Sequence, residues 1–159
     1  MKLFGARVPE AVRQLRLEER RLAWALSATG VPLVATPTHL YVGQDRLAWT
    51  GIERVSWQPP TLSVIEGAEV EGTGRTRSWE LDTQSRLAEI VRARVTSSVA
   101  WSDRRALHPS GAVRLVGRRT PGQDALDWQT VWEPGTDPAA PALQAQAREW
   151  VAALRKTIG

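Results

Sequence analysis

Short runs of alternating apolar and polar residues, separated by turn sequences, constrain this chain more than any other feature. Alternation with a period of two places successive side chains on opposite faces of an extended strand. Eight such runs lie between residues 22 and 133, and turns such as TGVP, GQDR, HPSG and TPGQD separate several of them. Strands that follow one another through short turns pair in antiparallel fashion, so we expect a mainly antiparallel sheet.

The eight runs differ in how regular they are. Pro37 lacks an N–H group and therefore implies an edge position or a bulge in its run. Gly51 indicates a bend or bulge inside another run. The predicted strands cover residues 22–28, 33–42, 47–57, 61–65, 75–81, 99–107, 112–119 and 126–133.

Three segments switch to the 3.6-residue period of an α-helix. A short helix is predicted over 9–16, an inserted helix over 83–97 and a C-terminal amphipathic helix over 138–157. Asp137 and Pro138 fit the cap and first position of the last helix. One apolar stripe on it must pack on the end or the open face of the sheet. Its members are Leu143, Ala147, Trp150, Val151, Leu154 and Ile158.

Length and charge limit the class of protein. A chain of 159 residues is expected to form a single domain, residues 1–159. It has no cysteine, no apolar run long enough to span a bilayer and no apolar signal-peptide core near its start, so we expect an intracellular, cytoplasmic protein. The net charge of +4 comes from 19 arginines and 2 lysines, and residues 72–119 alone carry a net +6. This middle third is the candidate surface for an anionic partner.

Two phrases carry a family resemblance. VATPTHLYV, with Thr36 or Thr38 followed by His39 and Leu40, resembles the second strand of bacterial pleckstrin-homology and GRAM-type domains. RLAWTGIERVSW resembles their third strand, and VATPT and RVTSSV are similar to phrases of a family of small actinobacterial proteins. The resemblance implies an α+β fold. By this resemblance the fold would be an antiparallel barrel of about seven or eight strands over 20–159, after an N-terminal extension at 1–19. Domains of this fold bind lipid headgroups, peptides and proteins.

Most of the tryptophan side chains are predicted to lie in the hydrophobic core. Seven of the eight tryptophans occupy inward positions of their predicted elements, which suits their large apolar area. These are Trp24, Trp49, Trp57, Trp79, Trp128, Trp132 and Trp150. Trp101 is the exception, because it neighbours Arg104 and Arg105 and could stack on a guanidinium or on a ligand.

Signals for catalysis or metal binding are absent from the sequence. The motifs of serine hydrolases, P-loop proteins, zincins and dinucleotide-binding folds do not occur. His39 and His108 are 69 positions apart, which makes a poor metal site. GTGRT at 72–76 precedes a strand rather than a helix and so lacks the dipole of a phosphate loop. We therefore expect no catalytic residue, cofactor or metal.

A basic cluster is the remaining candidate site. A hairpin through 108–111 would join two arginine-bearing strands, close to arginines of the inserted helix. The candidate residues are Arg92, Arg94, Arg104, Arg105, Arg114, Arg118, Arg119 and Trp101. The alternative is a solvated, ion-paired face, with Glu80, Glu89 and Asp103 near in sequence.

The leading hypothesis is a non-catalytic binding or adaptor module that docks a protein partner or an acidic lipid surface through the basic hairpin. Nucleic-acid binding is the first alternative. A small-ligand pocket at the open end of the barrel, with or without catalysis, is the second. Self-association through a sheet edge is also open.

Overall fold

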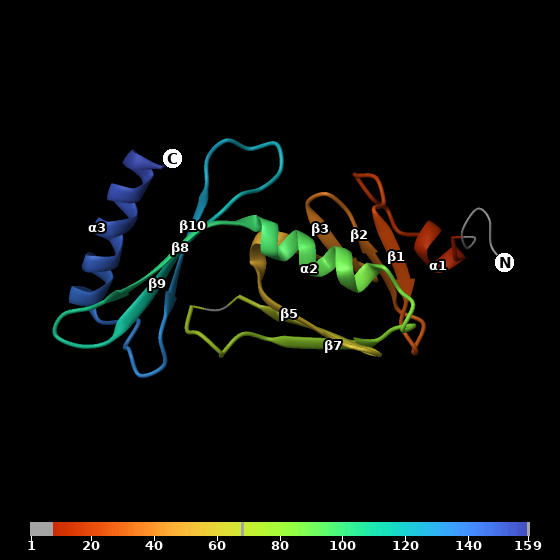
Figure 1. Ribbon diagram of the computed structural model, residues 1–159, viewed down its shortest axis with the longest axis horizontal. Coiled ribbons are helices and arrows are strands. Elements are labelled where there is room, and N and C mark those ends of the chain that lie inside the picture. The colour runs from red at the N-terminus through yellow and green to blue at the C-terminus, as the bar shows by residue number, and fades with distance from the viewer. Residues whose placement is uncertain (1–7, 68, 159) are drawn as a thin grey trace.

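Ten antiparallel strands in three sheets and three α-helices make up the computed structural model, counted over residues 8–67 and 69–158, the residues that it describes. The first sheet has the order β1-β2-β3-β4, the second β5-β6-β7 and the third β10-β9-β8. α1 and α3 lie at opposite ends of the long axis, and α2 lies between them (Figure 1). None of these helices is long and apolar enough to cross a membrane.

The bounds of the elements are as follows. The strands are β1 (Ala23–Leu26), β2 (Pro32–Ala35), β3 (His39–Val42), β4 (Asp45–Ala48), β5 (Ile52–Gln58), β6 (Thr61–Glu66), β7 (Thr76–Glu80), β8 (Val99–Ala106), β9 (Ala112–Arg118) and β10 (Asp127–Trp132). The helices are α1 (Glu10–Arg13), α2 (Leu87–Ser98) and α3 (Pro141–Thr157), with a 3₁₀ turn η1 (Trp49–Gly51).

Two of the predicted strands are each divided in two. The run 33–42 reverses direction at Thr36, whose N–H bonds to the His39 carbonyl at 2.9 Å and whose hydroxyl oxygen accepts the His39 N–H at 3.1 Å. The run 47–57 is interrupted by η1, which contains Gly51. Pro37 and Gly51 therefore mark breaks between strands rather than local bulges, which is why the structure has ten strands where the sequence predicts seven or eight.

The sheets do not close into a barrel, and the buried apolar residues form three clusters. The main cluster joins the first two sheets to α2, and includes Leu40, Leu62 and Val91. A second cluster lies between the third sheet and α3, and includes Leu115 and Leu143. A third, around Val12, lies between α1 and the other face of the first sheet. The predicted barrel is therefore not present, and α2, not the C-terminal helix α3, covers the first two sheets.

The C-terminal helix starts later than predicted. Pro141 occupies its first turn, and the Asp137 carboxylate instead accepts the N–H of Ala139 at 2.9 Å in the preceding turn. The apolar stripe is confirmed for five of its six members, since Leu143, Ala147 and Leu154 are buried on the third sheet and Trp150 and Val151 are partly buried there. Ile158, at the end of the stripe, is exposed.

The tryptophans are less uniformly buried than predicted. Trp49 and Trp132 are 2% and 4% exposed, and the Trp49 indole N–H donates to the Thr36 carbonyl at 2.9 Å. The other tryptophans are only partly buried. Trp101 and Trp128 meet edge to face, with ring centroids 5.7 Å apart, across Gly117 on the strand between them. A β-carbon at Gly117 would lie 3.1 Å from the Trp128 ring, so glycine permits this pairing.

Candidate functional site: the central cleft

A cleft of about 480 Å³ lies between the third sheet and the segment from η1 to β5. We call it the central cleft. Its walls come from three strands of one sheet and from chain some 60 residues earlier, so no local sequence pattern could reveal it. Its lining residues with charged side chains are Glu53, Glu69, Glu71, Arg114 and Arg118.

Arg118 is the buried cation of the central cleft. It is 5% exposed, and its guanidinium donates to the side-chain oxygen of Gln129 at 3.1 Å and to the Ser98 hydroxyl at 2.8 Å. Burial lowers the pKa of Arg118, and the negative charge of Glu53 acts in the opposite direction. The Gln129 amide in turn donates to the Thr50 carbonyl at 2.7 Å. These contacts connect the third sheet to the end of α2 and to η1.

Glu53 lines the central cleft because of an irregularity in β5. The pairing of β5 with β6 shifts register between Ile52 and Arg54, so Glu53 is an extra residue. Such bulges redirect side chains. One carboxylate oxygen of Glu53 is buried and has no hydrogen-bond partner among the residues that the structure describes. A second register shift, between Val99 and Trp101 of β8, also borders the central cleft.

The acidic loop before β7 forms one rim of the cleft. Val70 makes a bridge to Trp132 of β10. The Trp132 N–H donates to the Glu69 carbonyl, and the Glu71 N–H donates to the Trp132 carbonyl, each at 2.8 Å. The sequence indicates only a polar glycine-rich loop here, whereas the structure fixes its main chain along the edge of the third sheet. Glu69 and Glu71 thereby line the central cleft together with Arg114.

The predicted arginine-bearing hairpin is present, but its cations lie on both faces. Arg104 and Arg114 are direct cross-strand partners on one face. Arg104 forms a two-pronged ion pair with Glu133, which raises the pKa of Arg104 and lowers that of Glu133. Arg105 lies on the opposite face beside α3, where it pairs with Asp103 at 3.0 Å and its guanidinium lies 5.4 Å from the Trp150 ring centroid.

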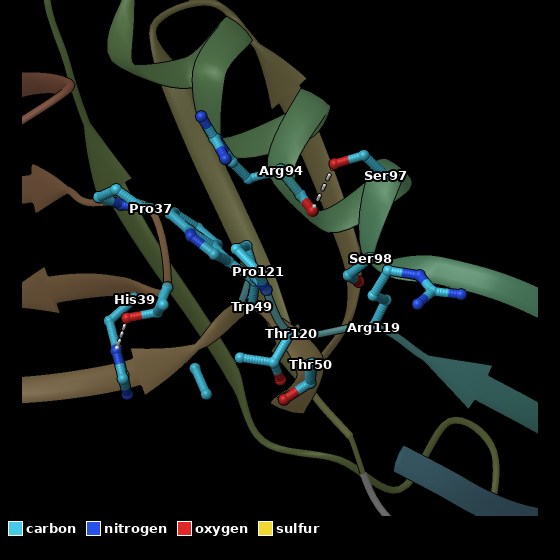
Figure 2. Close-up of a pocket in the computed structure, with 12 residues that line it drawn as sticks. Pro37, His39, Trp49, Thr50, Arg94, Ser97, Ser98, Arg119, Thr120 and Pro121 are labelled. Atoms are coloured by element: carbon cyan, nitrogen blue, oxygen red, sulfur yellow. Dashed lines mark hydrogen bonds between the residues drawn. The ribbon is translucent and has the colours of Figure 1, made fainter. Parts of the chain in front are cut away.

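The remaining predicted residues lie outside the central cleft. Arg92 lines a neighbouring groove between α2 and β5 that also includes Glu53. Arg94 and Arg119 line a small pocket of about 140 Å³ beside Trp49, and their guanidinium groups point away from each other (Figure 2). Trp101 packs on the α3 side of the third sheet. Of the eight predicted residues, only Arg114 and Arg118 line the central cleft.

A second polar network surrounds His39, and its acid was not predicted. The Glu19 carboxylate accepts the Thr36 hydroxyl at 2.8 Å and also the Thr38 hydroxyl. Thr38 has one hydroxyl proton, so Nδ1 of His39, 2.6 Å from the Thr38 oxygen, must itself donate. Burial raises the pKa of Glu19, but the hydrogen bonds from Thr38 and Thr36 outweigh it and the pKa is lowered. The network ties the chain before β1 to the first sheet.

The fold and this geometry define an α+β protein with a cleft of mixed charge. Among residues 8–67 and 69–158, no three histidine, cysteine, aspartate or glutamate side chains are grouped so that they could hold a metal ion. Comparison of the chain with protein-family models, with curated proteins and with solved structures finds no match.

Proposed function

We propose that this protein is a non-catalytic binding module, and that its central cleft holds a small molecule that carries both a carboxylate and an ammonium group. The observation that supports this is that two arginines and three glutamates line one hollow of about 480 Å³. Ligand pockets usually measure about 300–1,000 Å³, so a molecule of amino-acid or dipeptide size fits.

The arginines are suited to the carboxylate. A guanidinium has five N–H donors in a planar fork that matches a carboxylate. Arg118 uses two of its donor atoms in bonds to Gln129 and Ser98, and Arg114 uses one in a bond to Ser102 at 3.2 Å. Donors on both side chains are therefore left for a ligand.

The glutamates are suited to the ammonium group. The buried, unpartnered oxygen of Glu53 needs a hydrogen-bond donor, since a buried acceptor left unsatisfied costs about 1–3 kcal/mol. Glu69 and Glu71 add two further carboxylates at the rim. Two cations and three anions give the cleft a net charge of −1, which favours a zwitterion or a cation over a simple anion.

An extended acidic partner on the basic hairpin is less well supported. Such a partner needs cations on one open face, whereas Arg104 is paired with Glu133, Arg105 lies beside α3 and Arg118 is buried. Acidic lipid and nucleic acid share this requirement. The experiment below therefore also measures whether Arg114→Ala loses binding to acidic lipid or to nucleic acid.

The pleckstrin-homology-like scaffold also stays a prediction. It is supported by the arrangement of β1–β7, which form a four-stranded and a three-stranded antiparallel sheet around one apolar cluster. A helix, α2, follows them directly and covers that cluster. On this interpretation the terminal helix of the scaffold is α2, and the third sheet with α3 is an addition to it.

The test is thermal unfolding of the protein with a panel of amino acids, dipeptides, dicarboxylates and diamines. A ligand at about 100 times its dissociation constant stabilises the folded state by about 2.7 kcal/mol. We expect zwitterions to raise Tm. Arg114→Ala should remove the rise, because it removes a cation that lines the cleft. Acidic vesicles and a DNA duplex are included as the alternative partners.

Arg104→Ala is the matched control. Arg104 is the cross-strand partner of Arg114, is a cation of the same face and does not line the central cleft. Ligand stabilisation that survives in Arg104→Ala and disappears in Arg114→Ala supports the proposal. Equal effects of the two substitutions, stabilisation by dicarboxylates alone, or binding only to vesicles or DNA would contradict it.

A further inference from the structure

Along its outer edge, β1 has main-chain groups that no strand among residues 8–67 and 69–158 pairs with. Within that part of the chain β1 is the first strand of its sheet and pairs with β2 alone. Ser27 N–H bonds to the carbonyl of its direct partner Val31 at 2.9 Å. Because hydrogen-bonded and non-hydrogen-bonded pairs alternate in an antiparallel ladder, Ala23 and Ala25 direct their N–H and C=O groups to β2. The N–H and C=O groups of Trp24 and Leu26 then face outward.

A groove of about 810 Å³ runs along this edge. We call it the β1 groove. One wall is the whole of β1 with Arg21 and Leu22, and the other is formed by residues 82–90, from the end of the loop after β7 into α2. The Ala28 N–H, just beyond β1, already donates to the Glu80 carbonyl at 2.9 Å. Trp24 and Leu26, further along the same edge, line the β1 groove, which gives another extended strand room to pair with them.

The side chains of the β1 groove leave room for apolar groups. Ala23 and Ala25 are small and lie on the face that packs toward α2, where Leu87 and Ile90 form the opposite side. Leu26 is one of the exposed large apolar residues. An added strand would place every second side chain between β1 and α2.

The charged groups of the β1 groove favour an acidic occupant. Arg21 and Arg86 line it and are exposed, and neither has an ion-pair partner among the described residues. The one carboxylate of the lining, Asp82, already accepts the N–H of Gln84 at 2.9 Å. Arg86 also immediately precedes α2, where the helix dipole adds to its positive charge.

We infer that the β1 groove binds an extended, acidic peptide segment of a partner protein, which adds to the first sheet as a strand beside β1. Main-chain bonds to Trp24 and Leu26 supply the affinity. Pockets between β1 and α2 select apolar side chains at alternate positions, and the two arginines select carboxylates. This site is separate from the central cleft and does not depend on the function proposed for it.

The experiment selects random octapeptides displayed on phage against the full-length protein, with Leu26→Pro as the counter-selection target. Proline removes the outward N–H of residue 26 and leaves the β1–β2 ladder intact. We expect enriched peptides with apolar residues at alternate positions and at least one acidic residue. A fluorescein-labelled copy of the most enriched peptide then gives dissociation constants by fluorescence polarisation.

Two arginine substitutions test the contribution of charge to peptide binding, and N-methylated peptides test the contribution of main-chain hydrogen bonds. Arg86→Glu should weaken binding at least tenfold, whereas Arg92→Glu, on α2 but outside the β1 groove, should change it less than twofold. N-methylation removes every second N–H group of the peptide. A peptide methylated at the amides that face β1 should not bind, whereas a peptide methylated at the other amides should still bind. This comparison does not depend on whether Leu26→Pro folds normally.

Four results would overturn the inference: no enrichment over Leu26→Pro, enriched peptides without acidic residues, equal effects of Arg86→Glu and Arg92→Glu, or equal binding of all N-methylated peptides. Sedimentation velocity covers the remaining occupant, because a dimer that Leu26→Pro dissociates would assign the edge to a second copy of this chain. Binding that persists in Arg114→Ala shows that the β1 groove acts independently of the central cleft.

Discussion

Substitution of Arg118 by methionine should destabilise the protein by about 3 kcal/mol. Methionine keeps most of the aliphatic length and removes the guanidinium, so the change isolates the polar contacts of a side chain that is 5% exposed. Two bonds from the guanidinium are lost, to Gln129 and Ser98. The substitution also removes the positive charge on which the negative charge of Glu53 acts.

The magnitude follows from these losses and one gain. Hydrogen bonds to a charged group contribute about 1.5–3 kcal/mol each, and removal of one partner of a buried polar set costs about 3–5 kcal/mol. Relief from burying the guanidinium reduces the total, and a net loss of about 3 kcal/mol remains. In a chain of this length each kcal/mol lowers Tm by about 2–4 °C, so a fall of about 6–12 °C is expected.

Urea unfolding followed by tryptophan fluorescence measures the loss, with calorimetry for Tm. Arg114→Met is the matched control, since Arg114 lies on the same strand and face but is exposed, and it should change stability by less than about 0.5 kcal/mol. Glu53→Gln in the Arg118→Met background should restore about 1 kcal/mol, because it removes the uncompensated carboxylate. Equal effects of Arg118→Met and Arg114→Met would refute the assignment of Arg118 as the buried link between the third sheet and the rest of the protein.

Two further predictions concern other parts of the fold. The folded-state pKa of Glu19 lies below its ordinary value of 4.5, so its contribution to stability is complete above that pH and is lost as the pH falls through the lowered pKa. Glu19→Gln should therefore lower Tm at pH 7 and bring the two proteins together in acid, and a Tm difference independent of pH would contradict this. Gly117→Val should cost about 1–3 kcal/mol and alter the near-ultraviolet circular dichroism, because its side chain would meet Leu126 and Trp128 at 3.0–3.1 Å. An unchanged spectrum and stability would show that the strands can separate to admit it.

The local elements could be predicted because their causes are local. The hairpin between β8 and β9 follows from alternation on both sides of a turn sequence, and it lies where the sequence predicts it. The inserted helix, predicted over 83–97, is α2, Leu87–Ser98. The stripe of α3 is buried at Leu143, Ala147 and Leu154 as its period requires.

The candidate site could be predicted only in part. Arg114 and Arg118 were found because a basic stretch is visible in the sequence. Glu53 was missed, since Gly51 indicates a bend or bulge in this run but the side chain that a bulge redirects depends on the pairing with the neighbouring strand. The grouping of the arginines was overestimated, because residues 104 and 105 are adjacent in sequence but lie on opposite faces of a strand.

The sequence by itself determined that the chain forms antiparallel strands and amphipathic helices, since side-chain period, turn residues and proline act within a few positions of each other. Only the tertiary structure decided which helix covers which sheet. Both α2 and α3 present an apolar stripe. Such a stripe does not specify its partner, because it packs on whichever apolar sheet face the chain brings within reach. That choice separates the third sheet from the first two, and it thereby creates the central cleft between them.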